Sequence, residues 1–238
     1  MPNIVSPRVE LIAHTRLVTT AREVAPCEYE ATTPIAAYMA PNPGATDAET
    51  LIEFAGRSCY QSFHRPNPKT ARTANYLERT LFEQAHWSIA EHATATLYFT
   101  GVSRAFTHEL IRHRHLSYSQ LSQRFVDESD ANIVVPPALR DGDEYTVNAA
   151  AAFAVEAYKD TAQGLIDSGV PRKQAREAAR AILPNAIETR IVVTGNLRAW
   201  NEVIARRTAP DADAEMIEVM GMVRDAIHPI APNIIKKD

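Results

Sequence analysis

Glycine is scarce in this sequence, with eight residues in a chain of 238. None of them forms the G-x-G-x-x-G pattern of a Rossmann dinucleotide site, and the P-loop pattern is missing as well. The sequence therefore indicates neither of these two nucleotide-binding folds.

Cysteine is rarer still, since only Cys27 and Cys59 are present. Two cysteines are too few for a disulfide scaffold, and the absence of a Cys-x-x-Cys pair argues against a structural zinc ribbon. Cys59 follows the apolar positions Leu51, Ile52 and Phe54, so we expect it to be packed and not to act as a nucleophile.

Long apolar runs are also absent, and the first residues, 1–7, lack a basic region followed by an apolar stretch. We therefore expect a cytoplasmic protein without a membrane segment. The net charge of −4 argues against general nucleic-acid binding by the whole surface.

The histidine spacing does not indicate a metal site. His108 and Glu109 begin like a zinc-protease helix, but that motif needs a histidine at the position of Arg112. His86 and His92 are also at a spacing that fits no common ligand pair. We predict no metal.

The composition, with 45% hydrophobic and 23% charged residues, is that of a globular protein. Helices and scattered strands without regular β-α-β alternation predict an α+β fold, with mixed helices around a small sheet in a single domain over 1–238. Apolar spacing in 212–228 predicts a helix that buries Met216 and Met220 in the core. We expect strands at 9–18, 93–100, 132–135 and 189–194. We expect helices at 47–60, 73–86, 103–113 and 141–168, a further helix from Pro171, and a last one at 212–228. Pro-rich loops are expected at 25–46 and 63–69.

The most informative segment is Arg112–Arg124, which holds three arginines, two histidines, three serines and two glutamines and has no acidic residue. Guanidinium groups bind phosphate oxygens in pairs, and Ser and Gln add neutral hydrogen-bonding groups. Charge runs are usually solvated faces, but those mix Lys with Glu, and this segment has neither. It predicts a pocket for a ligand that carries phosphates and a polar ring.

This segment resembles the signature of the flavin-dependent thymidylate synthases. In that signature, Arg-His-Arg is followed at fixed spacing by Ser, Asn-Glu, Ser and Arg. Arg112-His113-Arg114, Ser117, Ser122 and Arg124 match it, whereas Ser119-Gln120 replaces Asn-Glu. Gln120 keeps an acceptor oxygen but loses the charge. The resemblance extends over residues 83–215.

The resemblance implies a homotetramer that binds FAD between subunits and methylates dUMP to dTMP. It implies 5,10-methylenetetrahydrofolate as the carbon donor, NADPH as the reductant of the flavin, and no cysteine nucleophile. A flavin would supply the redox chemistry, and the protein would supply positioning and electrostatics.

The same resemblance implies a set of site residues. Arg207 would lie against the uracil ring and stabilise developing negative charge, as the catalytic residue. The FAD contacts would be His86, Ser88, Arg112, His113, Arg114, His115, Gln120, Asn196, Arg198 and Glu202. The dUMP contacts would be Glu109, Arg112, Gln120, Leu121, Ser122, Gln123, Arg124, Arg180 and Arg207.

Simpler interpretations stay open for several of these residues. Glu109 and Arg112 can form an i, i+3 ion pair, with or without a ligand. Arg180 can belong to a solvated stripe, and Arg206 can be exposed or pair with Asp211 or Asp213. Glu91 and His92 are expected to be internal hydrogen-bonding residues.

Three other functions compete with the synthase. One is a nucleotide-binding hydrolase or transferase that uses the same arginines without flavin. The second is a nucleic-acid-binding module, which would show affinity that falls steeply with salt. The third is a structural protein whose basic segment is an oligomer interface.

Overall fold

The computed structural model describes residues 1–17, 44–64, 67–140 and 142–237. Most of the loop predicted at 25–46 lies outside the described residues, as does Cys27. The strands and longer helices are β1 (Arg8–His14), α3 (Asp47–Tyr60), α4 (Thr73–Leu77), β2 (Thr94–Ser103), α5 (Arg104–Leu110), β3 (Leu116–Gln120), α6 (Glu144–Asp167), α7 (Arg172–Ala179), β4 (Glu188–Asn196), α8 (Leu197–Arg207) and α9 (Ala214–Ile227). Short 3₁₀ turns lie at Pro68–Thr70, Trp87–His92, Pro137–Leu139, Arg180–Ile182 and His228–Ile230, and a π-helical turn at Glu78–Glu83.

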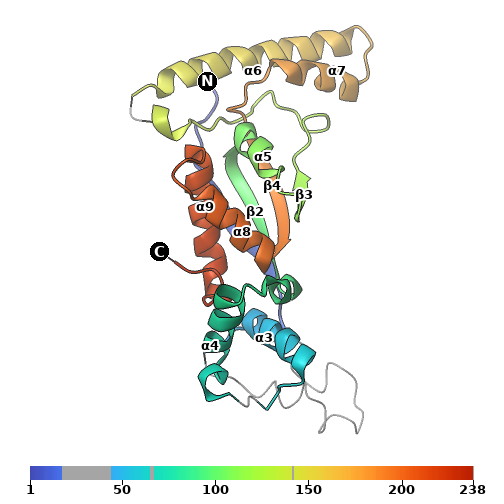
Figure 1. Cartoon of the computed structure of the whole chain (residues 1–238). Coiled ribbons are helices and arrows are strands. Elements are labelled where there is room, and N and C mark those ends of the chain that lie inside the picture. Colours follow the sequence, from blue (N-terminus) through green and yellow to red (C-terminus); the bar gives the residue numbers. More distant parts are fainter. Residues whose placement is uncertain (18–43, 65–66, 141, 238) are drawn as a thin grey trace. The chain divides into compact units, whose positions relative to one another are not determined.

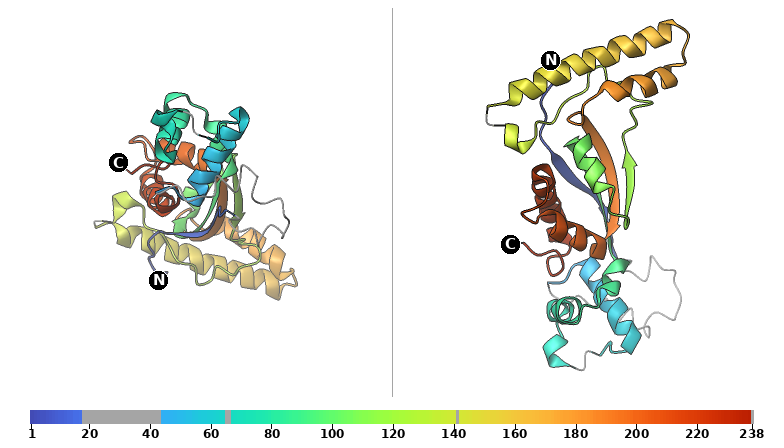
Figure 2. Two further views of the ribbon diagram at one scale, coloured as in Figure 1. Left: turned by 90° about the horizontal axis from the view of Figure 1, so that it is seen from below. Right: turned by 45° about the horizontal axis from the view of Figure 1, so that its top comes forward.

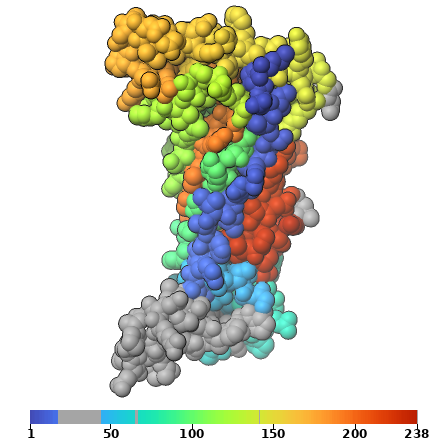
Figure 3. Space-filling model, turned by 180° about the vertical axis from the view of Figure 1, so that it is seen from behind, coloured from blue at the N-terminus to red at the C-terminus, as the bar shows by residue number. Residues whose placement is uncertain are grey.

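The strands form one antiparallel sheet of four, in the order β1-β2-β4-β3 (Figure 1). Successive side chains of a strand point to opposite faces, and in β2 Ala95, Leu97 and Phe99 are fully buried. The edge strand β1, drawn in blue in Figure 3, lies at the surface. Helices combined with this small sheet confirm the α+β class predicted from the sequence.

The chain divides into two compact units, each built from three segments. The first unit is Met1–Glu10, Leu97–Val193 and Arg206–Met222; the second is Leu11–Thr96, Thr194–Ala205 and Val223–Asp238. The single domain over 1–238 stays a prediction.

In the first unit, α5 packs on the sheet, with the rings of Phe106 and Phe99 6.0 Å apart. The helices α6 and α7 run side by side as an antiparallel hairpin (Figures 1 and 2). Gly169 ends α6 with a left-handed φ of +91°, and its N–H donates to the Ile166 carbonyl at 2.9 Å. Pro171 precedes α7 as its N-cap, so the predicted end of one helix and start of the next are both confirmed.

One glycine in the first unit is required by a close approach of the backbone. Gly101 has a φ of +64°, and a Cβ at this position would collide with the backbone carbonyl of Ser6. Its N–H donates to the Glu188 carboxylate at 3.0 Å. Any side chain here would therefore push the N-terminal segment off β2.

In the second unit, α3 begins with a capping box. The Thr46 hydroxyl accepts from Glu49 N–H, and the Glu49 carboxylate accepts from Thr46 N–H. The helix spans the predicted range, 47–60, and Thr46 is its N-cap. Glu49 is fully buried and also accepts from Asn233, which ties the C-terminal segment to the start of α3.

Two of the predicted elements need correction, and two elements of the structure were not predicted. The helix predicted at 73–86 is α-helical only to Leu77, passes into a π-helical turn, and ends before Ala85, whose φ is +56°. Residues 132–135 form no strand, because Ile133 alone among them forms β-bridges, one with Ile4 and one with Ile187. Pro136 and Pro137, which follow, have no N–H group to extend the pairing. Strand β3 lies inside the basic segment and was not predicted. Helix α8, which begins directly after β4, was not predicted either.

Helix α9 confirms its prediction, since Met216, Val219, Met220, Val223 and Ile227 are all fully buried. Cys59 is exposed within α3, which corrects the expectation that it is packed. No helix in the described part of the chain has the length and apolar character needed to cross a bilayer.

Candidate active site

The basic segment is displayed by a helix, a turn and a strand of the first unit. Ser103 caps α5, because its hydroxyl accepts from Phe106 N–H at 3.0 Å. The Tyr118 hydroxyl, on β3, lies 2.8 Å from the Leu110 carbonyl and 2.7 Å from the His113 carbonyl. Burial raises the pKa of Tyr118 to about 12, so this hydroxyl stays protonated and donates to the turn. The Tyr118 side chain therefore holds the turn that carries Arg112–His115 against β3.

Arg207 is held at the centre of a cluster of predicted site residues. Its Nε donates to His113 Nε2 at 2.9 Å, and its Nη1 lies 3.3 Å from Glu109 Oε2. Arg112 Nη1 lies 3.5 Å from the same carboxylate oxygen, so the predicted i, i+3 pair is present and shares its acid with Arg207. The Arg207 side chain is only 17% exposed. Two guanidinium groups thus share one carboxylate, which leaves net positive charge in the cluster.

His113 is a neutral hydrogen-bond acceptor in this arrangement. Burial, reinforced by the positive charges of Arg207, Arg206 and Arg112, lowers the pKa of His113 from 6.5, and Glu109 only partly opposes this. An acceptor role at Nε2 requires the ring hydrogen to be on Nδ1. The imidazole therefore orients Arg207 without neutralising its charge.

We expect His113 to titrate below the usual 6.5 and its pKa to rise in an Arg207→Ala variant, because that change removes a nearby positive charge. The measurement is an NMR pH titration of the imidazole protons, assigned with His113→Asn. Arg172→Ala, which changes an exposed residue of α7, is the control and should leave the value unchanged. A His113 pKa equal to that of an exposed histidine would contradict this assignment.

The direction of this shift also sets the pH dependence of stability. A histidine whose pKa is lower in the folded than in the unfolded protein contributes stability that is fully present above the unfolded value, about 6.5. That contribution is lost as the pH falls through the folded value. Acidification should therefore loosen the contact between Arg207 and His113, and alkaline pH should not.

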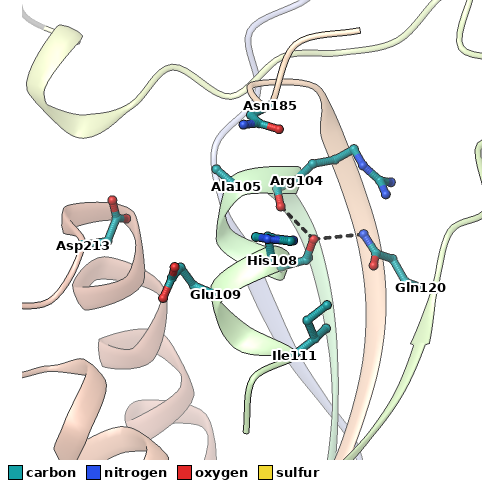
Figure 4. Close-up of a pocket in the computed structure, with 9 residues that line it drawn as sticks. Arg104, Ala105, His108, Glu109, Ile111, Gln120, Asn185 and Asp213 are labelled. Atoms are coloured by element: carbon teal, nitrogen blue, oxygen red, sulfur yellow. Dashed lines mark hydrogen bonds between the residues drawn. The ribbon is translucent and has the colours of Figure 1, made fainter. Parts of the chain in front are cut away.

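A pocket of about 470 Å³ opens beside this cluster (Figure 4). Glu109 and Gln120 are the predicted site residues that line it. Arg104 and His108, one turn apart on α5, line it as well, and Arg104 Nη1 is buried without a hydrogen-bond partner in the described part of the chain. The full lining is Arg104, Ala105, Thr107, His108, Glu109, Ile111, Gln120, Asn185 and Asp213. A polar lining with an unused guanidinium N–H suits an anionic or carbonyl-bearing ligand.

The frame of the pocket is fixed by a buried carboxylate. Glu215, at the start of α9, accepts from Ser103 N–H at 2.8 Å and from Ser103 Oγ–H at 2.6 Å. Asp213 caps the same helix by accepting from Glu215 N–H at 3.0 Å. Of the two alternatives left open for Arg206, exposure or pairing with Asp211 or Asp213, the structure shows Arg206 as exposed. The segment between Arg207 and α9 is therefore tied to the base of α5.

The second half of the basic segment turns away from β3. Phe125 and Val126 donate their N–H groups to the Ser122 carbonyl, at 3.1 and 2.9 Å. Gln123 is 5% exposed, and its Nε2 has no hydrogen-bond partner among the described residues. Arg124 lies 3.6 Å from Glu177 of α7. The structure thus places Gln123 inside the fold and Arg124 near the α6–α7 hairpin.

Not every predicted residue joins the cluster around Arg207. Arg114, His115 and Arg180 are exposed. Arg114 and His115 form no side-chain hydrogen bond or ion pair with any residue that the structure describes. Arg176, one turn before Arg180, forms an ion pair with Asp127, with Nη2 2.6 Å from Oδ2.

The remaining predicted FAD contacts belong to the second unit. Arg198 lies 2.7 Å from Glu91 and 3.1 Å from Glu202, and both carboxylates raise the pKa of Arg198. The Asn196 Oδ1 accepts from Ala199 N–H at 2.8 Å, so this residue caps α8 and keeps its amide N–H groups for other partners. His86 and Ser88 are exposed. Glu91 and His92 are exposed too, which corrects the expectation that they are internal.

Sequence reasoning missed Arg104, Thr107, His108, Asn185 and Asp213 as pocket residues. The spacing of Arg104, His108 and Glu109 on one helix was an available signal. Asn185 and Asp213 come from distant segments and gave none. In the described ranges, no group of three or more His, Cys, Asp or Glu side chains could hold a metal ion.

Fold and site together define an α+β protein with a polar pocket lined by arginine, histidine, glutamine and carboxylate side chains. The family model described as thymidylate synthase complementing protein matches residues 44–233. The chain therefore belongs to the flavin-dependent thymidylate synthase family, as its basic segment predicted.

Individual relatives agree with this membership. The chain is 45% identical over 243 residues to the flavin-dependent thymidylate synthase of Mycobacteroides abscessus, covering 98% of this chain and 90% of the relative. It is 52% identical over 186 residues to the flavin-dependent thymidylate synthase of Mycobacterium avium, and this alignment covers 73% of this chain and 74% of the relative.

Solved structures share the fold at low sequence identity. Thymidylate synthase X from Helicobacter pylori, solved with FAD and dUMP, has a TM-score of 0.65 at 19% identity and covers 97% of this chain and 100% of its own. A UMP/dUMP methylase, PolB, from Streptomyces cacaoi, bound with 5-Br UMP, has a TM-score of 0.68 at 22% identity, with coverages of 98% and 94%.

Proposed function

We propose that this chain is a flavin-dependent thymidylate synthase that converts dUMP to dTMP. The carbon comes from 5,10-methylenetetrahydrofolate and the reducing equivalents from NADPH through FAD. The homotetramer and the cytoplasmic location expected from the sequence are part of this proposal. Support comes from the name of a relative that aligns with 98% of this chain and from the FAD and dUMP in a structure of the same fold.

The observation that carries the proposal is the held guanidinium of Arg207. It lies against a neutral imidazole and a shared carboxylate, at 2.9 and 3.3 Å, beside a polar pocket. A positive charge fixed in advance stabilises negative charge that develops on a ring as it reacts. We assign that role to Arg207 and the orientation of Arg207 to Glu109 and His113.

The donor set fits a bound FAD. Arg114 and His115 are exposed, and their N–H groups are not used within the described chain, so they can bind pyrophosphate oxygens. Asn196 keeps its amide N–H groups for a ring edge. When bound, FAD supplies the hydride chemistry that these side chains lack. We propose contacts from His86, Ser88, Arg112, His113, Arg114, His115, Gln120, Asn196, Arg198 and Glu202.

For dUMP we propose the residues that the sequence indicated. Arg124 and Arg180 would hold the phosphate, since guanidinium forks bind phosphate oxygens in pairs. Gln120 and Glu109 line the pocket and would face the nucleoside. The full set is Glu109, Arg112, Gln120, Leu121, Ser122, Gln123, Arg124, Arg180 and Arg207.

Replacing Arg114 with alanine should weaken retention of FAD, because one charged pair of donors to the pyrophosphate is lost. An interaction with a charged group contributes about 1.5–3 kcal/mol, so the dissociation constant should rise by roughly one to two orders of magnitude. Flavin fluorescence titration measures it, with Arg172→Ala on exposed α7 as the matched control. Unchanged FAD affinity in both Arg114→Ala and Arg112→Ala would rule out the pyrophosphate role.

The decisive test of function is the visible spectrum of the purified protein with FAD under anaerobic conditions. NADPH should bleach the flavin, and dUMP should change the rate of bleaching. Addition of methylenetetrahydrofolate should then give dTMP. A protein that binds dUMP but not flavin would instead support a nucleotide hydrolase or transferase.

A further inference from the structure

Gln120 stands where the family signature usually has glutamate, and its amide is held by two buried threonines. Its Nε2 lies 3.0 Å from Thr107 Oγ1 on α5 and 3.3 Å from Thr189 Oγ1 on β4. Thr107 is 2% and Thr189 1% exposed, so water does not compete for these hydroxyls. The Gln120 side-chain amide thus connects β3 to both α5 and β4.

The direction of these hydrogen bonds follows from the backbone of Arg104. The Arg104 carbonyl can only accept, so the Thr107 hydroxyl donates its one hydrogen to it, at 3.0 Å. Thr107 Oγ1 can then only accept from Gln120. This requires the nitrogen of the amide, and not the oxygen, to face Thr107, as the dashed lines in Figure 4 trace.

Both amide hydrogens of Gln120 are therefore used inside the protein. Its Oε1 has no hydrogen-bond partner in the described part of the chain, is not among the buried unpaired atoms, and belongs to a residue that lines the pocket. Gln120 offers a ligand one neutral acceptor and no donor. Whatever it contacts must carry a hydrogen, such as a sugar hydroxyl or the N–H of a uracil ring.

We propose that Thr107 and Thr189 are positioning residues that lock Gln120 as a hydrogen-bond acceptor, so that the site selects a nucleotide that donates a hydrogen there. This inference rests on the proposed function. The locked amide keeps an acceptor where the signature has a carboxylate. It adds no negative charge to a pocket already lined by Glu109 and Asp213.

The first experiment compares Thr107→Val with Thr107→Ser in the full-length protein with FAD. Valine keeps the shape and removes the hydroxyl, which frees the amide to rotate. KM for dUMP should rise about tenfold with kcat nearly unchanged, the loss expected for one well-placed hydrogen bond. Serine should restore KM. Thr189→Val should act in the same direction, whereas the control Thr96→Val, which removes a hydroxyl paired with Thr194 at 3.0 Å, should not.

The second experiment starts from the wild-type protein, so it tests the acceptor role of Gln120 even if Thr107→Val does not fold. Wild-type protein should bind at least one of two dUMP analogues, lacking the 3′-hydroxyl or methylated at N3, about tenfold more weakly than dUMP. In Thr107→Val this discrimination should shrink, because a free amide can present its N–H instead. Equal binding of all three nucleotides by the wild type would overturn the acceptor role.

The two failures are distinguishable. A wild-type protein that neither binds nor methylates dUMP would overturn the proposed function itself. A wild type that turns over dUMP, with unchanged KM in folded Thr107→Val and Thr189→Val, would overturn only the positioning role. A parallel fall of kcat and stability that serine does not restore would also reject it, in favour of a purely structural role.

Discussion

Replacing Arg207 with alanine should lower kcat/KM for dUMP by about 10² to 10³, the effect of losing one preorganised donor worth roughly 3–4 kcal/mol in the transition state. The guanidinium is held in advance by His113 and Glu109, at 2.9 and 3.3 Å, so little reorganisation is needed when charge develops on the substrate. Turnover is measured as dTMP formation, and flavin absorbance should show that FAD remains bound.

Two further variants separate charge from geometry. Arg207→Lys keeps the charge but loses the planar guanidinium that contacts both His113 and Glu109. Its activity should therefore lie between those of the wild type and Arg207→Ala. Arg206→Ala removes the exposed neighbouring charge and should stay close to wild type. Normal turnover in Arg207→Ala would show that the catalytic assignment is wrong.

The parts of the fold that the sequence predicted are those set by local patterns. The boundary between the helix predicted at 141–168 and the helix predicted from Pro171 follows from short-range spacing, as do the buried methionines of α9. The spacing within Arg112–Arg124 likewise sufficed to identify the family.

What could not be predicted depends on distant partners. Strand β3 reads Leu-Ser-Tyr-Ser-Gln and is mostly polar, and its identity as a strand depends on β4, where the Arg190 carbonyl accepts from Leu121 N–H at 2.9 Å. His113 is 94 residues before Arg207 in the sequence, so no local sequence pattern predicts the hydrogen bond between them. Exposure was misjudged for Cys59 and Glu91 for the same reason, since it depends on what other segments cover.

Breaking the buried ion pair of the second unit should give the largest loss of stability. Arg57 and Glu53 are one turn apart on α3, with Nε 2.7 Å from Oε1 and side chains only 3% and 0% exposed. Arg57 also donates to the Thr70 carbonyl at 2.5 Å and lies 4.3 Å from the centre of the Tyr76 ring. One guanidinium thus joins α3 to the segment that leads into α4.

Arg57→Ala should lower the free energy of unfolding by about 3–5 kcal/mol, because the buried Glu53 carboxylate would lose the guanidinium that pairs with it at 2.7 Å. Thr73 still donates to that carboxylate, at 2.6 Å, but a hydroxyl cannot replace a positive charge. Urea unfolding followed by circular dichroism measures the loss.

Lys236→Ala is the matched control for this loss, since Lys236 and Glu78 form a similarly short pair, 2.6 Å, with both side chains about half exposed. Breaking an exposed pair should cost less than about 1 kcal/mol, because water solvates the charge that remains. A double variant, Glu53→Gln with Arg57→Met, removes both charges and should recover part of the stability that Arg57→Ala loses. Equal losses in Arg57→Ala and Lys236→Ala would mean that burial of the charge is not what makes this contact important.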